Sequence, residues 1–184
     1  DDTGIEPGTV GYAEAVARDP RDWKSHVDRA AILSGQKNHG QVVVETTRAI
    51  QINPQAAHAY ALRAYSLYNL DRLQEALADC EKALEIDGRQ VMPLLVRARI
   101  LVRQGKGADA VADCQAALKL SPQSFWAYST TGIVLAATGD NDGALKALTR
   151  AIQLAPGDAD SLAARGKVYL SLRRYRSAGD DLNA

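Results

Sequence analysis

The sequence predicts an all-α fold, a solenoid of consecutive antiparallel helix pairs, and three observations lead to this prediction. Short phrases recur every 34 residues, in the order RAIQINP, KALEIDG, AALKLSP and RAIQLAP. Each phrase ends a stretch with two runs of apolar residues at the spacing of an amphipathic helix. Proline or glycine then closes the stretch, where it ends one helix and opens the next. A fixed period of this length is typical of stacked repeat units.

The 34-residue period divides the chain into units from its first residues to its last. Residues 1–22 are predicted to hold a partial preceding repeat, because Tyr12, Ala15 and Pro20 fall where the end of a repeat would place them. The later units are four full repeats, 23–56, 57–90, 91–124 and 125–158, and a truncated fifth, 159–184. We call these repeats one to five and number positions from the first residue of each.

Repeat two shows most clearly why each unit should hold two helices. Apolar residues recur at helical spacing from Tyr60 to Leu70 and again from Leu73 to Leu84, on either side of a turn. In repeats three and four, Gly105 and Gly139 occupy this turn, where the end of a helix favours glycine. Small residues such as Ala76 recur at fixed positions and allow the two helices of a unit to pack closely.

The period and the order of large and small residues resemble the tetratricopeptide repeat family over nearly the whole chain. The matching residues of repeat four are Tyr128, Thr131, Gly132, Leu135, Ala144, Leu148, Ala151 and Pro156. Repeat one departs most, with His26 and His39 in aromatic positions and Val42 in a small position. The resemblance implies a right-handed superhelical α-solenoid in which the first helices line a concave groove.

An arginine and an acidic residue recur together in four repeats, at positions seven and twenty-three. Repeat four lacks both and has Thr131 and Ala147 instead. Because the two vanish together, we predict an ion pair between the two helices of one repeat. The residues concerned are Arg29 and Glu45, Arg63 and Asp79, Arg97 and Asp113, and Arg165 and Asp181. A pair between neighbouring repeats, and two unrelated solvated positions, are the alternatives.

Composition excludes several classes of protein. Apolar residues make up 46% of the chain and charged residues 24%, which is typical of a globular protein. A net charge of zero provides no overall field to attract nucleic acid or an anionic membrane, and no apolar run is long enough to insert into one. We expect a soluble chain, cytoplasmic or exported after loss of a leader, and its 15 arginines against 7 lysines are typical of a GC-rich bacterial source.

The sequence contains no motif that would support catalysis. The histidines His26, His39 and His58 fall at three different repeat positions, which favours structural roles over a shared metal site. Cys80 and Cys114 share position twenty-four and are expected to be small apolar core residues, too far apart for a disulfide. We therefore predict a non-enzymatic chain without a metal or another cofactor.

The family resemblance places positions two, five, six, nine, twelve and thirteen on the groove wall. The candidate groove residues are His58, Leu62, Tyr65, Tyr68, Asn69, Met92, Leu95, Val96, Arg99, Arg103, Trp126 and Thr130. Repeat four adds Ile133, Ala136 and Ala137 to this wall. Arg99 and Arg103 lie four residues apart, so both could bind one carboxylate. The alternative is that the aromatic residues close the packing between repeats and the arginines are solvated.

These features predict a scaffold whose groove binds an apolar peptide or helix of another protein, with an acidic group. The carboxylate clamp of some family members is disfavoured, because only Lys24 fits it and Asp28 would repel a carboxylate. One alternative function is self-assembly, since no polar capping helix follows repeat five. Another is that the chain is the targeting or regulatory arm of a larger protein.

Overall fold

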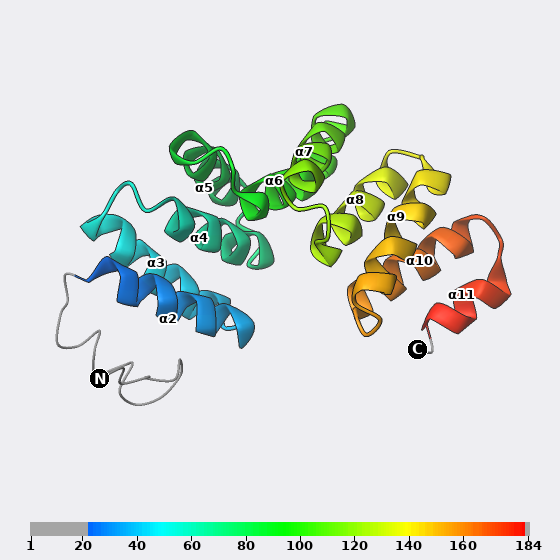
Figure 1. The fold of residues 1–184 in the computed structure, drawn as a ribbon, viewed down its shortest axis with the longest axis horizontal. Helices are drawn as coiled ribbons and strands as arrows, with labels where there is room; N and C mark the ends of the chain where they lie inside the picture. The colour runs from blue at the N-terminus through cyan, green and yellow to red at the C-terminus, as the bar shows by residue number, and fades with distance from the viewer. Residues whose placement is uncertain (1–21, 183–184) are drawn as a thin grey trace. The chain divides into compact units, whose positions relative to one another are not determined.

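A computed structural model describes residues 22–182 of the chain, and in that range it contains ten α-helices and no strand. The helices are α2 (Trp23–Gly35), α3 (His39–Ile52), α4 (Ala57–Asn69), α5 (Leu73–Ile86), α6 (Val91–Arg103), α7 (Gly107–Leu120), α8 (Phe125–Ala137), α9 (Asn141–Leu154), α10 (Ala159–Ser171) and α11 (Tyr175–Leu182). They follow one another as hairpin pairs (Figure 1). The prediction of an all-α fold of repeated helix pairs is confirmed. Residues 1–21, which hold most of the predicted partial repeat, lie outside the described residues.

The helical pattern has the same period as the sequence. The first helices of the five pairs begin at Trp23, Ala57, Val91, Phe125 and Ala159, each 34 residues after the one before. The second helices begin with the same interval. The apolar pattern of each segment thus determines where its helices start.

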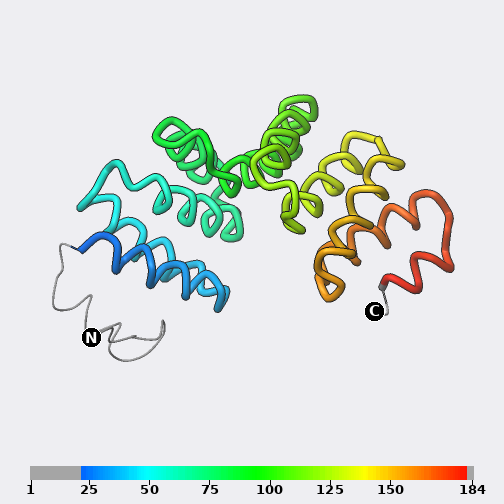
Figure 2. The backbone as a smooth tube through the Cα atoms, in the orientation of Figure 1, coloured from blue at the N-terminus to red at the C-terminus, as the bar shows by residue number. Residues whose placement is uncertain are grey.

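The helices belong to two compact units. The N-terminal unit extends to Val96 and the C-terminal unit begins at Arg97, so the boundary falls inside α6. Within each unit the backbone forms consecutive helical hairpins, which are clearest in the tube view (Figure 2). We describe each unit by itself.

The turn inside each helix pair contains a residue in the left-handed conformation. These residues are Lys37, Asp71, Gly105, Gly139 and Arg173, each at position fifteen of its repeat. Their φ angles lie between 57° and 92°. Glycine, which adopts this conformation without strain, occupies only two of the five turns.

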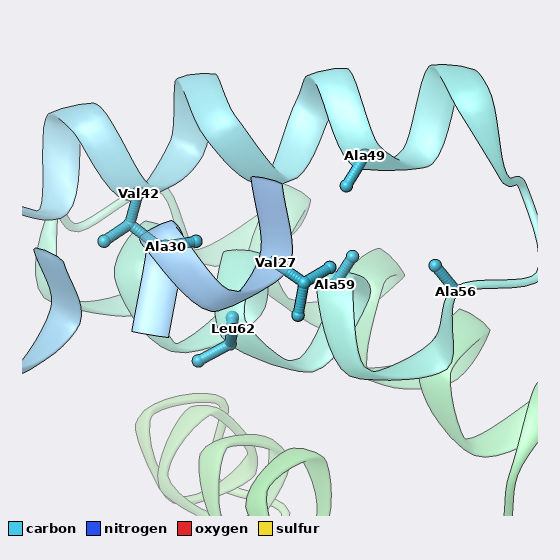
Figure 3. Close-up of a cluster of buried hydrophobic side chains, with 7 residues drawn as sticks. All are labelled: Val27, Ala30, Val42, Ala49, Ala56, Ala59 and Leu62. Atoms are coloured by element: carbon cyan, nitrogen blue, oxygen red, sulfur yellow. The ribbon is translucent and has the colours of Figure 1, made fainter. Parts of the chain in front are cut away.

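Small side chains form much of the core. In the N-terminal unit, Ala30, Ala49 and Ala59 are fully buried and pack with Val27 and Val42 between α2, α3 and α4 (Figure 3). Alanine at these positions allows the helix backbones to approach closely. The core is therefore built from close helix contacts as much as from large side chains.

Two core clusters can be described in the C-terminal unit. Cys114, which is 1% exposed, packs with Ala98, Ala110 and Val134 where α6, α7 and α8 meet. Leu148 of α9 is fully buried in the second cluster. Cys80 of the N-terminal unit is buried as well, so both cysteines lie in the interior.

Three arginine–aspartate pairs join the two helices of a repeat. Arg63 donates to both carboxylate oxygens of Asp79, with Nε to Oδ2 at 2.7 Å and Nη2 to Oδ1 at 2.8 Å. The same two-point contact brings together Arg97 and Asp113, and also Arg165 and Asp181. The bond to Asp79 raises the pKa of Arg63 above its ordinary value.

The outer pairs also link neighbouring repeats. Arg63 donates from Nη1 to the hydroxyl of Thr47 at 3.1 Å, and Arg165 donates to Thr149 at the same distance. Each threonine belongs to the repeat before that of its arginine. One guanidinium therefore holds three helices together.

Repeat one differs from the prediction of an Arg29–Glu45 pair. Glu45 contacts Nδ1 of His26 at 2.7 Å and Nη1 of Arg48 at 3.3 Å, and these are its ion-pair partners within the described residues. His26 lies one helical turn before Arg29 on the same face of α2. Glutamate is one methylene longer than aspartate, which allows Glu45 to reach the earlier residue.

Candidate functional site

The C-terminal unit contains a pocket of about 500 Å³ between the first helices of three consecutive pairs. The helices are α6, α8 and α10, with one contribution from the start of α9. The lining residues are Arg99, Ile133, Ala136, Ala137, Asn141, Asp160, Ala163, Ala164, Lys167, Val168 and Ser171. This volume is typical of pockets that accept a small ligand or a few side chains, about 300–1,000 Å³.

The apolar residues that line the pocket, which we call its floor, have mainly small side chains. Alanines from α8 and α10 supply most of it, together with Ile133 and the buried Val168. Because alanine projects little beyond the backbone, an occupant can approach these helices closely. The floor therefore suits apolar side chains without filling the space itself.

Polar side chains form the rest of the lining. Arg99 of α6 and Lys167 of α10 occupy position nine of repeats three and five, with Ile133 at the same position between them. Asp160 stands at the start of α10 and Ser171 at its end. A molecule bound in the pocket would thus meet the cations Arg99 and Lys167, and also the carboxylate of Asp160 near the start of α10.

Nine of the eleven lining residues stand at groove positions, but the candidate residues given by the sequence include only four of the eleven. Arg99, Ile133, Ala136 and Ala137 stand at those positions in repeats three and four. The further residues Asp160, Ala163, Ala164, Lys167 and Ser171 stand at the same positions in repeat five. Shifting the repeat-four positions by 34 residues would have found them.

Several candidate groove residues are buried and belong to the core. Leu62 and Val96 occupy position six and Leu95 position five, and all three are buried. Thr130, at position six of repeat four, is 1% exposed. Positions five and six therefore serve helix packing in repeats two to four, and they reach the surface at Ala163 and Ala164 in repeat five.

Thr130 also has an unusual environment for a hydroxyl group. Its Oγ1 is buried and has no hydrogen-bond partner among the described residues. The side chain does not line the pocket. Its methyl group contributes to the packing of α8, and the hydroxyl is a local cost.

The N-terminal unit presents the remaining candidate residues on α4 and at the start of α6. His58 and Asn69 are exposed, and Tyr65 and Tyr68 are half-buried. Tyr65 meets His39 edge to face, with ring centroids 5.7 Å apart. Burial lowers the pKa of His39, and the charge of Lys37 lowers it further. His39 therefore serves aromatic packing.

Met92, Trp126 and Arg103 take different positions. Met92 is partly buried against the core cluster of the N-terminal unit. Trp126 is half-buried and Arg103 is exposed, and neither lines the pocket of the C-terminal unit. The structure thus brings Arg99 together with Lys167 at this pocket and does not bring Arg103 to it.

The described residues contain neither a cluster of metal ligands nor a helix able to span a membrane. Within residues 22–182, no group of three or more His, Cys, Asp or Glu side chains is arranged to hold a metal ion. No helix in the described part of the chain has the length and apolar character needed to cross a bilayer.

Comparison with solved structures reveals the same fold in several proteins. YrrB, a TPR protein with an unusual peptide-binding site, is 22% identical with a TM-score of 0.62, and the match covers 94% of this chain and 89% of YrrB. TTC0263, a thermophilic TPR protein of Thermus thermophilus, is 20% identical with a TM-score of 0.77, over 86% and 87% of the two chains. PilW, a type IV pilus biogenesis factor, is 21% identical with a TM-score of 0.76, over 92% and 79%. At these identities the likeness concerns the fold alone.

Sequence comparison points to the same group. No curated protein matches the chain. Two family models do, both of the tetratricopeptide repeat, one over residues 57–90 and the other over 129–184. Together with the 34-residue period and the five described helix pairs, these matches identify the chain as a tetratricopeptide repeat protein.

Proposed function

We propose that the chain is a non-enzymatic protein-interaction scaffold and that its C-terminal unit binds an apolar segment of a partner in the pocket between α6, α8 and α10. The observation that carries this proposal is the pocket itself, an apolar floor of small side chains with charged groups around it. Tetratricopeptide repeat proteins serve as interaction scaffolds, and the fold relative YrrB has a peptide-binding site.

The chemistry of the pocket favours a segment with both apolar and acidic groups. One or two apolar side chains would contact the alanine floor, where their burial contributes about 25 cal/mol per Å². A carboxylate beside them would meet Arg99 or Lys167, and an arginine can bind it through two parallel hydrogen bonds. Asp160 disfavours a second carboxylate near the start of α10.

The N-terminal unit offers a second contact area for the same kind of partner. Tyr65, Tyr68 and Met92 are large side chains that remain partly accessible, and tyrosine is enriched among residues that dominate binding energy. His58 and Asn69 are exposed nearby on α4 and would supply polar contacts. This area is proposed as an additional anchor, separate from the pocket.

Self-association is the second candidate function. Leu170 and Tyr175 are exposed at the last helix pair, by 44% and 66% of their surfaces. Exposed apolar side chains of this size can pack against another copy of the chain. Light scattering should then show a mass that rises with concentration, and a monomer at every concentration would exclude this function.

The pocket proposal can be tested with a variant that fills the pocket. Ala137 is exposed and lines the pocket, so Ala137→Trp should block it without disturbing the core, and Ala137→Ser is the matched control. Peptides would first be selected from a phage-displayed library of random 12-residue sequences on the unmodified chain. Fluorescence anisotropy should show at least tenfold weaker binding to Ala137→Trp and little change with Ala137→Ser.

Circular dichroism of both variants must show an unchanged helical spectrum. Selected peptides that bind Ala137→Trp as tightly as the unmodified chain would contradict a role for this pocket. Attention would then move to the tyrosines of the N-terminal unit.

A further inference from the structure

The turn between α10 and α11 carries the densest group of positive charge in the described chain. Arg173, Arg174 and Arg176, which we call the arginine turn, are all exposed. Exposed Tyr175 lies among them, and exposed Leu170 lies on the last turn of α10. The chain as a whole has no net charge, so the positive charge here is local.

A hydrogen-bonded backbone fixes the arginine turn. The N–H of Arg173 donates to the carbonyl of Leu170 at 3.0 Å, and the N–H of Arg174 donates to that of Tyr169 at 2.8 Å. The carbonyl of Arg174 in turn accepts from the N–H of Ala178 at 3.1 Å. The arginines are therefore displayed from a defined turn.

Helix electrostatics does not explain these charges. Arg174 precedes the first residue of α11 and Arg176 lies in its first turn, where the partial positive charge of a helix N-terminus disfavours cations. In repeat four the equivalent positions hold Asp140 and Asp142, and Asp140 caps α9 by accepting from the N–H of Gly143 at 2.8 Å. Repeat five has Arg174 in place of this capping aspartate, so α11 lacks the stabilising cap.

Two other repeats also have a cation before the second helix, and both balance it with an acid three residues later. Arg72 donates to Glu75 at 2.8 and 2.7 Å, and Asp109 lies three residues after Lys106 in the first turn of α7. The equivalent residue of repeat five is Ser177, and the first turn of α11 contains no acid. The partial negative charge at the C-terminus of α10 favours a cation at Arg173, which follows that helix. It does not favour one at Arg176, which lies in α11.

We propose that the arginine turn binds an acidic stretch of the same partner segment whose apolar part occupies the pocket. This inference rests on the proposed function. The arginine turn lies close to the pocket along the chain, because Ser171 lines the pocket and Arg173 follows it by two residues. A single short segment could therefore place an apolar side chain in the pocket and an acidic group at the arginine turn.

The composition of the surface favours a protein segment. Arginine and tyrosine are the residues most enriched at protein interfaces, and each guanidinium can bind a carboxylate through two hydrogen bonds. Leu170 offers an apolar contact beside them, which a peptide side chain would cover. Nucleic acids and anionic lipids could also meet the arginines, and the experiment includes both.

The experiment compares the unmodified chain with a triple variant, Arg173→Gln, Arg174→Gln and Arg176→Gln. The matched control removes three exposed cations elsewhere, by Arg89→Gln, Lys119→Gln and Lys146→Gln. A random 12-residue phage library selected on the unmodified chain should yield apolar residues followed or preceded by aspartate or glutamate. The triple variant should select apolar residues without this enrichment.

Selected acidic peptides should bind the triple variant about tenfold more weakly in low salt, since the variant lacks the three cations that would pair with the acidic groups of the peptide. Their binding should also depend less on salt, and the control variant should bind normally. Equal affinity and equal acidic enrichment with the triple variant would overturn the proposal. Equal binding by Ala137→Trp would instead refute the pocket, whatever the arginines do.

Two further probes separate the kinds of anion. A 20-nucleotide single-stranded RNA and vesicles containing phosphatidylserine should bind more weakly than the selected peptides. Tighter binding of either one, lost in the triple variant, would overturn the assignment to an acidic protein segment.

A second variant removes the concern that a loss of binding reflects misfolding. Arg174→Asp with Arg176→Glu restores the acidic start seen in repeat four and should raise the melting temperature while abolishing peptide binding. A raised melting temperature with full binding would show that the arginines have no part in recognition. A lowered melting temperature would contradict the electrostatic argument for the turn.

Discussion

Arg63 and Asp79 form an ion pair that joins the two helices of repeat two. The same arginine also contacts the preceding repeat. The carboxylate is buried and the guanidinium is mostly buried, so each depends on the other for its hydrogen bonds. The hydroxyl of Thr47 accepts a third hydrogen bond from the same guanidinium. Removing the acid therefore leaves a partly buried cation whose remaining contacts are neutral, the hydroxyl of Thr47 and the ring of Tyr60.

We expect Asp79→Ala to lower the free energy of unfolding by about 2–3 kcal/mol, toward the low end for broken buried pairs because Arg63 retains some exposure. Urea denaturation measures this value. Gln74→Ala, an exposed change on the same helix, should have little effect. A double variant, Arg63→Met with Asp79→Leu, should recover much of the loss, and failure to recover would mean that Asp79 acts through other contacts.

Cys114 predicts a pH dependence at the alkaline end. Burial raises the pKa of this thiol from 9.0 to about 11, against the opposing effect of a hydrogen bond with Thr131. A raised folded pKa stabilises the folded state fully below pH 9 and loses that contribution as the pH rises toward 11. The free energy of unfolding should therefore fall between these values.

The measurement compares the unmodified chain with Cys114→Ala across this range. The difference in unfolding free energy between the two should shrink by about 1 kcal/mol at pH 10, because one pKa unit corresponds to 1.36 kcal/mol. Taking the difference removes the titration of lysines and tyrosines, which both proteins share. Parallel curves up to pH 11 would show that the thiol titrates normally.

The turns inside the helix pairs are the clearest feature at the scale of an element. Position fifteen needs a positive φ in every described repeat, and Lys37 adopts one of 57°. A residue with a side chain costs about 1–2 kcal/mol in the left-handed conformation. Replacement by glycine removes this cost, but part of the gain is lost because glycine has more conformational freedom in the unfolded chain.

Lys37→Gly should therefore stabilise the protein by about 0.5–1 kcal/mol, seen as a higher melting temperature. Lys37→Ala controls for the loss of charge and should not stabilise. Gly139→Ala tests the same position in reverse and should destabilise by about 1 kcal/mol, since its φ is 92°. Stabilisation by Lys37→Ala as well would assign the effect to charge.

The contact between α8 and α9 depends on a glycine that is required by close approach. A Cβ at Gly132 would lie 2.4 Å from Cγ of Leu148 and 3.1 Å from the backbone oxygen of Ala144. Leu148 is fully buried and its neighbourhood is packed, so the side chain has little space in which to move. The two helices must separate before a larger residue can fit.

Gly132→Ala should therefore destabilise by about 1–3 kcal/mol, although alanine normally improves a helix by up to about 1 kcal/mol. Gly179→Ala in α11 is the matched control, because nothing lies within 4 Å of its Cβ position. That change should stabilise slightly. Denaturation of both variants measures the contrast, and equal effects would show that α8 and α9 separate at little cost.

Across the whole molecule, stability is built from repeats and from the contacts between neighbouring repeats. The buried residues of the described clusters come from neighbouring helix pairs, from α2 to α4 in one cluster and from α6 to α8 in another. In such an array the free energy of unfolding is approximately a sum of local contributions. A defect should therefore be felt most in its own unit.

Gly132→Ala offers the test. Native-state hydrogen exchange should show faster exchange in α8, α9 and α10, and nearly unchanged exchange in α2, α3 and α4 of the N-terminal unit. Uniform acceleration over all helices would mean that the whole chain unfolds as one cooperative body.

The 34-residue pattern alone determined the all-α fold of helix pairs and the interval at which the described helices begin. It could do so because the apolar spacing, the turn and the small packing residues are properties of a short local segment. The joint loss of arginine and aspartate in repeat four pointed to the pairs of Arg63, Arg97 and Arg165 for the same reason. Each of these pairs connects helices that a single hairpin brings together.

The tertiary structure decided what a single repeat cannot specify. Whether positions five and six are core, as at Leu62, or surface, as at Ala163, depends on what the neighbouring helices cover. Glu45 contacts His26 because the length of its side chain matches the distance between two packed helices. The pocket joins Arg99 to Lys167, residues two repeats apart, because packing places α6, α8 and α10 around one space. Local pattern determines a helix and its apolar face, whereas a site between helices depends on how those faces meet.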